Sequence, residues 1–129
     1  VNKLLKALAE DRPRNLRIVE DIRSLLAPGH EGTVLVVSDR VGHCETLADL
    51  LGAAGVQVAV LTGRTAAEDR ARIVSEVQED RVQVLVSTLQ LIGEGFDCPG
   101  LSTLVLATPI KFEGRLLQVV GRIMRPANV

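Results

Sequence analysis

Val34-Leu35-Val36-Val37, followed at once by Ser38-Asp39-Arg40, is the stretch that decides the fold class of this 129-residue chain. Four consecutive apolar residues without polar alternation predict a strand that is buried on both faces, as in a parallel sheet covered by helices. Three further apolar runs have the same character, at residues 56–61, 82–86 and 104–107. The chain therefore has the strands for one buried sheet, and its length fits a single domain.

Helical patterns separate these apolar runs. Residues 42–51 carry leucines at helical spacing and end close to two glycines. Thr65-Ala66-Ala67-Glu68 has the form of a capping box, which predicts that a helix opens there. The expected buried face of that helix comprises Ala67, Ile73, Val74 and Val77.

The N-terminal segment also predicts helix. Residues 2–27 read as two helical pieces that are broken at Arg12-Pro13 and stopped by Pro28-Gly29. The expected apolar face of the second piece comprises Leu16, Val19, Ile22 and Leu26. Together these patterns predict an α/β fold of three layers, with a mainly parallel sheet and an N-terminal helical extension.

The composition narrows the classes of function. With a formal net charge of −1, the chain lacks the overall basicity of a free-standing nucleic-acid binder, so any phosphate contacts must be local. Two Phe and no Trp or Tyr argue against a surface that stacks bases on aromatic rings. No apolar run is long enough to span a bilayer. Because the chain begins at Val1 rather than Met, we expect a fragment of a longer protein.

The cysteines and histidines offer little chemistry. Cys44 and Cys98 are 54 positions apart and belong to no CxxC or Cys/His cluster, so we expect no metal site and no disulfide framework. Free thiols in a reducing, cytoplasmic compartment are the simplest interpretation. His43, near the start of a predicted helix, is interpreted as a cap or surface group rather than a catalytic base.

Polar residues follow three of the predicted strands. Ser38-Asp39-Arg40 follows the first, Thr62-Gly63-Arg64 the second and Ser87-Thr88 the third. Because ligands gather at the carboxyl ends of parallel strands, these hydroxyls, amides and cations are suited to holding a phosphate backbone. Ordinary turn chemistry favours the same residue types, and the residues alone leave both interpretations open.

The loop Gly93-Glu94-Gly95-Phe96-Asp97-Cys98-Pro99-Gly100 follows the third strand. Its glycines permit close approach of a ligand, and Asp97 can accept hydrogen bonds from sugar hydroxyls. A turn-forming Asp beside Pro99-Gly100 is the alternative. Glu94 has no His or second carboxylate to support it in this loop, so we do not expect it to act as a general base.

Two arginines three residues apart end the segment Gln118-Val119-Val120-Gly121-Arg122-Ile123-Met124-Arg125. At about 100° per residue, Gln118, Arg122 and Arg125 share one face of a helix, and apolar side chains fill the other. Guanidinium groups stay charged and match the geometry of phosphate, which favours an anion clamp. An ordinary solvated helix face is the alternative.

The order of Thr88, the Gly95-Phe96-Asp97 loop and residues 118–125 resembles motifs V and VI of superfamily 2 helicases. Residues 34–40 are similar to motif IV. The resemblance covers the whole chain and implies a RecA-like (P-loop NTPase-like) second motor domain at residues 31–129, preceded by a helical linker at residues 1–30. Within the superfamily, the chain most resembles the DEAD/DEAH-box helicases related to type III restriction subunits and DNA-repair translocases.

The resemblance implies an ATP site shared between two domains. Arg122 and Arg125 would be arginine fingers that reach the γ-phosphate of ATP, and Gln118 would lie near the same phosphates. Gly95 and Asp97 would approach the ribose and the domain interface.

The other half of that site is missing from the sequence. No Gly-rich loop ending in Gly-Lys-Ser/Thr occurs, and no Asp-Glu pair follows a strand. ATP and Mg²⁺ would therefore be held mainly by a first RecA-like domain, and we expect no ATP hydrolysis by the isolated chain.

The resemblance also implies contacts to a nucleic-acid strand from Arg40, Gly63, Arg64 and Thr88. The motifs depart from the DEAD-box pattern in three places: nine positions separate Thr88 from Asp97, Leu89 replaces an acidic residue, and Gln118 replaces His. These departures favour a duplex-tracking translocase, and DNA over RNA.

Two other classes of function stay open at this point. One is a non-catalytic interaction module, in which the arginine pair binds a carboxylate or phosphate of a protein. The other is a small Rossmann-like nucleotide-binding domain, although Asp39-Arg40-Val41-Gly42 supplies only one glycine after the first strand.

Overall fold

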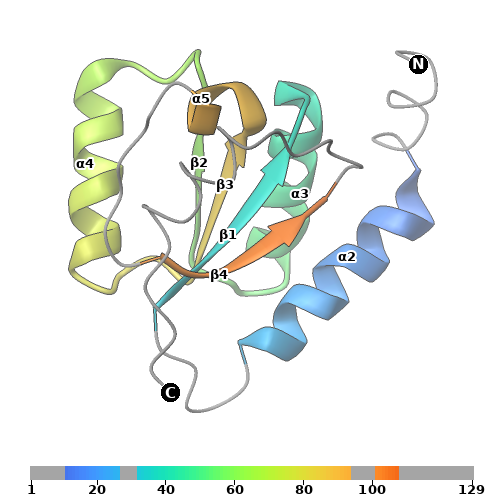
Figure 1. Cartoon of the computed structure of the whole chain (residues 1–129). Coiled ribbons are helices and arrows are strands. Elements are labelled where there is room, and N and C mark those ends of the chain that lie inside the picture. Colours follow the sequence, from blue (N-terminus) through green and yellow to red (C-terminus); the bar gives the residue numbers. More distant parts are fainter. Residues whose placement is uncertain (1–10, 27–31, 94–100, 108–129) are drawn as a thin grey trace.

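The computed structural model describes residues 11–26, 32–93 and 101–107, in which helices and strands alternate along the chain (Figure 1). The helices are α2 (Arg12–Leu25), α3 (Val41–Ala53), α4 (Ala67–Gln78) and the short α5 (Leu89–Gly93). The strands are β1 (Thr33–Ser38), β2 (Val58–Leu61), β3 (Val84–Thr88) and β4 (Leu101–Leu106). No helix within these ranges has the length and apolar character needed to cross a membrane.

The strands of the described residues form one parallel sheet in the order β2-β3-β1-β4. β1 lies between β3 and β4, with Leu35 opposite both Leu85 and Leu104. Every residue of β1 and β3 is buried, as the apolar runs predict. The α/β class and the parallel sheet are thus confirmed, and the carboxyl ends of β1, β2 and β3 lie at one edge.

Each face of the sheet packs against its own helices, because successive strand residues point to opposite faces. One face packs against α4 and α5 through a cluster that includes Leu35, Val37, Leu85, Ile73, Val77 and Leu91. The other packs against α3 and α2 through a cluster that includes Val34, Val36, Val84, Leu47, Leu51, Val19 and Ile22. The result is the predicted arrangement of three layers, with α2 beside α3 (Figure 1).

β2 begins later than its apolar run, which starts at Val56. The Val56 N–H donates to the Leu51 carbonyl at 3.0 Å, and Gly55, at φ +87°, turns the chain out of α3. The Gln57 N–H donates to the side-chain Oε1 of Gln83 at 2.9 Å. The backbone N–H groups of Val56 and Gln57 are therefore bonded to the end of α3 and to the Gln83 side chain, and β2 starts only at Val58.

The predicted capping box before α4 is wrong. The helix begins at Ala67, and its N-cap residue, Ala66, makes no side-chain capping bond. Thr65 Oγ1 instead accepts the Thr62 N–H at 3.0 Å, so the hydroxyl closes the preceding turn. Ala67 is exposed because the helix starts there, whereas the predicted Ile73 and Val77 are buried and Val74 is partly buried.

The predicted buried face of α2 is confirmed at Val19 and Ile22 and is wrong in the first turn of the helix. Asp11 caps the helix by accepting the Arg14 N–H at 3.1 Å. Val19 and Ile22 are buried as predicted, but Leu16 is 41% exposed and Asn15 takes the buried place one turn before Val19. This face packs beside α3. The division into residues 1–30 and 31–129 stays a prediction.

Candidate functional site

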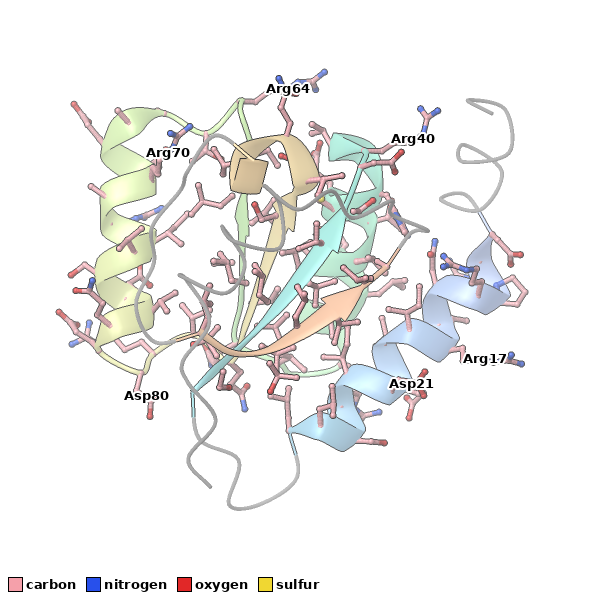
Figure 2. All side chains as sticks on the ribbon, viewed as in Figure 1. Arg17, Asp21, Arg40, Arg64, Arg70 and Asp80 are labelled. Carbon is pink, nitrogen blue, oxygen red and sulfur yellow. The ribbon has the colours of Figure 1, made fainter. Side chains whose placement is uncertain are left out.

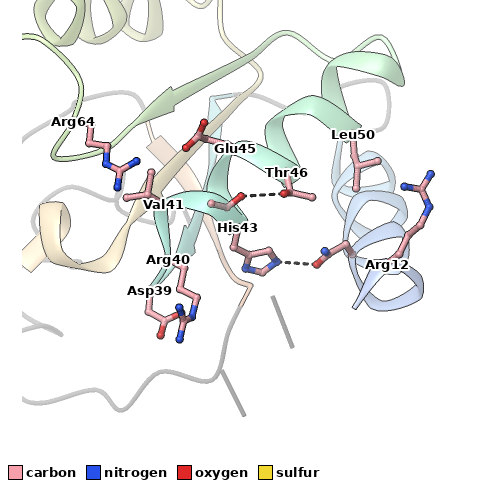
Figure 3. Close-up of a pocket in the computed structure, with 11 residues that line it drawn as sticks. Arg12, Asp39, Arg40, Val41, His43, Glu45, Thr46, Leu50 and Arg64 are labelled. Carbon is pink, nitrogen blue, oxygen red and sulfur yellow. Dashed lines mark hydrogen bonds between the residues drawn. The ribbon is translucent and has the colours of Figure 1, made fainter. Parts of the chain in front are cut away.

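An open cleft of about 820 Å³ lies at the carboxyl end of β1 (Figure 3). Three guanidinium groups line it, from three parts of the chain: Arg12 in α2, Arg40 at the start of α3 and Arg64 after β2. Asp39 and Glu45 are the carboxylates in its lining. Figure 2 shows Arg40 and Arg64 projecting from the same end of the sheet. The cleft is therefore locally cationic in a chain whose net charge is −1.

A smaller hollow of about 480 Å³ continues from the cleft toward β2. The two hollows share Val41, Glu45 and Arg64, and the smaller one adds Thr62 and Thr65. Arg64 therefore borders both hollows, and an extended ligand that runs along this edge of the sheet would pass it.

The turn after β2 is closed by its own side chains. The Thr62 N–H donates to Thr65 Oγ1 at 3.0 Å, and the Thr65 N–H donates back to the Thr62 carbonyl at 3.1 Å. The Arg64 N–H donates to Thr62 Oγ1 at 3.1 Å. Gly63 is exposed, and a Cβ placed on it would meet no atom within 4 Å. The two threonines thus hold the backbone from which Arg64 projects, beside an open glycine.

The turn after β1 leads directly into α3. The Arg40 N–H donates to Ser38 Oγ at 3.3 Å, and the Arg40 carbonyl accepts the Cys44 N–H at 3.1 Å. Arg40 is the N-cap residue and supplies no side-chain cap, and the first turn of α3 contains no acidic residue. The positive end of the helix dipole therefore opens on the cleft beside the Arg40 guanidinium.

A buried histidine connects this turn to α2. His43, only 2% exposed, has its Nδ1 2.8 Å from Ser38 Oγ and its Nε2 2.8 Å from Asn15 Oδ1. Figure 3 shows the bond from His43 to α2 as a dashed line. The interpretation of His43 as a cap or surface group is wrong, because its ring lies in the layer between α3 and α2 and both nitrogens are hydrogen bonded.

The surroundings of α3 set the protonation of two of its side chains. Burial lowers the pKa of His43 from its ordinary value of 6.5, and the nearby positive charge of Arg14 lowers it further, whereas Asp39 opposes both. The histidine is therefore held neutral. Burial raises the pKa of the adjacent Cys44 thiol to about 12, so this side chain is an unreactive part of the core.

The remaining predicted strand contact, Thr88, lies at the same edge as Ser38, with which it is paired in the sheet. It is 5% exposed, so the structure places it beneath the surface of this edge rather than on it. The structure thus brings Arg40, Gly63, Arg64 and Thr88 to one end of the sheet, with Arg64 and Gly63 the most accessible.

Five predicted residues lie outside the described residues, namely Gly95, Asp97, Gln118, Arg122 and Arg125. Their roles therefore stay predictions. Within the described ranges, no three His, Cys, Asp or Glu side chains are grouped so that they could hold a metal ion.

Sequence reasoning did not single out Arg12 or Asn15 as residues of the site. The signal for Asn15 is its spacing, because it stands four and seven positions before the buried Val19 and Ile22. A polar residue on the apolar face of a helix indicates a buried hydrogen-bond partner.

The family model for the helicase conserved C-terminal domain matches residues 17–127 of this chain. The chain belongs to this family. The crystal structure of UvsW from phage T4 resembles the helicase domain with a TM-score of 0.77 at 21% identity, over 95% of this chain and 24% of that one. The RecA-like fold and the resemblance to the second domain of superfamily 2 helicases are thereby confirmed.

Two curated relatives match most of the helicase domain at about 30% identity. A protein of Escherichia phage T5 described as a probable helicase is 31% identical over 97 residues, which are 75% of this chain and 21% of the relative. A pre-mRNA-splicing ATP-dependent RNA helicase of Yarrowia lipolytica is 30% identical over 105 residues, 81% of this chain and 18% of the relative. The chain spans only 21% to 26% of the length of the first curated relatives that it matches.

Proposed function

We propose that this chain is the second motor domain of an ATP-dependent helicase or translocase, and that the cleft at the end of β1 holds the phosphate backbone of the tracked strand. The observation that carries the proposal is the meeting of Arg40, Arg64 and the start of α3 at one concave edge. The family match supports it, because it covers β1 and the segments that follow it through residue 127.

The chemistry of the cleft suits a backbone rather than a base sequence. Guanidinium groups and helix N-terminal amides bind phosphate oxygens irrespective of the bases. Arg40 and Arg64 stand on different turns, so they would contact phosphates at two places along the strand. Asp39 and Glu45 would repel phosphates from their own parts of the cleft and thereby confine the path.

The proposed ATP site uses residues of this chain that follow motif V in the sequence. Arg122 and Arg125 have the fixed charge and planar donors that suit a γ-phosphate, and Gln118 can donate to the same group. ATP bound with Mg²⁺ by a first RecA-like domain would supply the phosphoryl group that is hydrolysed. The two arginines would stabilise the negative charge that develops on that group.

DNA is the proposed track. The departures of Leu89 and Gln118 from the DEAD-box pattern favour it, whereas the splicing relative is named as an RNA helicase. A protein distinguishes the two nucleic acids through the ribose 2′-hydroxyl, so matched DNA and RNA strands test this choice directly.

The strand site can be tested with fluorescein-labelled dT20 and rU20, followed by fluorescence anisotropy on the 129-residue chain. Arg40→Ala and Arg64→Ala should each weaken dT20 binding about three- to tenfold and lower the salt dependence by about one phosphate contact. Arg17→Ala is the matched control, because Arg17 is exposed on α2 and points away from the cleft (Figure 2).

The outcomes separate the proposal from its alternatives. Unchanged affinity and salt dependence in both cleft variants would overturn the strand site. Equal or tighter binding of rU20 would keep the strand site but contradict the choice of DNA. Binding of NAD without binding of either strand would favour the Rossmann-like alternative, and binding of neither class would favour an interaction module.

A further inference from the structure

The hydrogen-bonded chain Asn15–His43–Ser38–Arg40 is not explained by phosphate binding alone. It runs from α2, through the ring of His43 in α3, to the hydroxyl at the end of β1 and on to the backbone N–H of Arg40. The two bonds made by His43 are each 2.8 Å long and buried. A polar connection therefore joins the helix that precedes the sheet to the residue that enters the cleft.

The partners fix where the protons of this chain lie. Asn15 Oδ1 is an acceptor, so His43 Nε2 must carry a hydrogen and donate it. In the neutral ring, Nδ1 is then an acceptor and receives the hydrogen of Ser38 Oγ. The oxygen of that hydroxyl stays available to accept the Arg40 N–H. This arrangement satisfies every member with a neutral imidazole, in which Nδ1 is the acceptor of the Ser38 hydroxyl.

We propose that His43 is a positioning residue, which holds Arg40 in place for the strand and makes that placement depend on the docking of α2. This inference rests on the proposed function of Arg40 as a strand contact. His43 is too buried to touch the strand itself and acts through Ser38.

Packing alone does not require a polar connection here. α2 and α3 already share an apolar cluster that includes Val19, Ile22, Leu47 and Leu51. Polar side chains buried among such residues destabilise the fold unless their hydrogen bonds are complete. The polar chain makes the orientation of Ser38 depend on the position of α2. If α2 is displaced, His43 loses the oxygen that accepts its Nε2 hydrogen, and the ring that orients Ser38 is no longer held.

The charged groups around His43 come from every element that meets there. Arg12 and Arg14 belong to α2, Asp39 and Arg40 to the turn after β1, and Glu45 to α3, while Arg64 lines the same cleft. A proton on Nδ1 would take away the acceptor of Ser38, and four of these six groups are positive. Acid should therefore loosen Arg40 by the same route as a substitution at His43.

Two substitutions cut the connection on opposite sides of the ring. His43→Asn places an amide oxygen close to the position of Nδ1, so it keeps an acceptor for Ser38 and loses the bond to Asn15. His43→Gln places its amide nitrogen close to the position of Nε2, so it keeps the bond to Asn15 and loses Ser38. Asp11→Ala is the matched control for stability, because it removes the cap of α2 without touching the connection.

The measurements are urea unfolding and the anisotropy of dT20 at pH 8 on the whole 129-residue chain. His43→Gln should weaken dT20 binding about three- to tenfold, the worth of one lost hydrogen bond. His43→Asn should weaken it by a smaller factor, because the side chain that holds Ser38 is released from α2, and Asp11→Ala should stay within about twofold. In the background Arg40→Ala, His43→Gln should weaken binding no further, because its effect passes through Arg40.

Each result bears on the inference. If the loss of dT20 affinity simply follows the loss of stability in His43→Asn, His43→Gln and Asp11→Ala alike, His43 has a structural role only and the inference is overturned. The inference is also overturned if the effect of His43→Gln adds to that of Arg40→Ala. If His43→Gln does not fold, Ser38→Ala removes the same contact and is expected to give the same binding loss, and normal binding by Ser38→Ala would overturn the inference. An Arg40→Ala chain that binds dT20 normally contradicts the proposed strand contact of Arg40 instead, which keeps the two failures distinct.

Discussion

The turns after β1 and β2 bring an arginine each to the same cleft by different means. The turn after β2 is closed by Thr62 and Thr65 within four residues, and the Arg64 N–H is bonded to Thr62 in the same turn. The turn after β1 is held through Ser38 and His43 by Asn15, which is 28 positions from His43 in the sequence. The conformation of the turn after β2 is set within the turn itself, whereas the conformation of the turn after β1 can change when α2 moves.

This difference suggests a division of labour along the strand. Arg64 would act as a constant point of contact, and Arg40 would be the contact that a movement of α2 can weaken. A motor that tracks a strand must release and renew its hold in each cycle, and a contact coupled to a neighbouring helix supplies one place for that change.

The largest effect is expected away from both turns, at the proposed arginine fingers. In a full-length helicase that carries this domain, Arg122→Ala should lower strand-stimulated ATP turnover about 10³- to 10⁵-fold, because the developing charge on the γ-phosphate loses a fixed cation. Affinity for dT20 should stay near that of the unchanged helicase, since the proposed strand site is the cleft and not the arginine fingers. Steady-state phosphate release and anisotropy measure the two quantities.

Arg72→Ala is the control for the finger variant. Arg72 is an exposed arginine of α4 that forms ion pairs with Asp69 and Glu76 at 3.6 Å. Its removal should leave ATP turnover unchanged, because exposed pairs contribute little to stability. Near-normal turnover in Arg122→Ala would contradict the finger assignment while leaving the comparison of the two turns intact.

A smaller effect is expected from acid, and only the turn after β1 should feel it. Burial and Arg14 lower the pKa of His43 in the folded chain, so folding favours the neutral ring. The stability that this contributes is complete above the unfolded pKa of about 6.5 and is lost as the pH falls from there through the lowered folded pKa. Urea midpoints between pH 8 and pH 5 should therefore decline more in the unchanged chain than in His43→Asn.

The same pH series sharpens the comparison through binding. Loss of dT20 affinity below pH 6.5 should be smaller in Arg40→Ala, which keeps only the contact of the β2 turn, than in Arg64→Ala, which keeps the contact held by His43. Parallel pH profiles for the two variants would show that neither turn is coupled to the histidine.

Much of this arrangement could be predicted from the sequence because it follows from short-range patterns. Continuous apolar runs such as Val34 to Val37 specify a strand covered on both sides, and parallel strands then place their polar ends together. Arg40 and Arg64 follow two of these predicted strands in the sequence, and the cleft contains both.

The connection through His43 could not be predicted in this way because its members are far apart in the sequence. A histidine two residues into a helix looks like a cap or surface group until the helix that covers it is known. The predicted face of α2 is wrong in its first turn for the same reason: Leu16 is the more apolar residue, but the Asn15 side chain can accept a hydrogen bond from the buried ring of His43. Tertiary partners, rather than local preference, decide such positions.

The smallest effect is expected at Gly63, and it tests how closely the strand passes the turn after β2. An added Cβ meets no protein atom within 4 Å, so Gly63→Ala should leave the free energy of unfolding unchanged or raise it by about 0.4 to 1 kcal/mol. If the phosphate backbone lies against this turn, the methyl group should still weaken dT20 binding by no more than about tenfold, the worth of one displaced contact. Gly52→Ala is the matched control near the end of α3, where the new Cβ would lie 3.8 Å from Val58 and away from the cleft. Neither substitution alters the hydrogen bonds of Thr62 and Thr65 or those of His43. Equal affinities of the two variants for dT20 would therefore mean that the strand does not pass close to Gly63. The turn after β2 would then contact the strand through Arg64 alone.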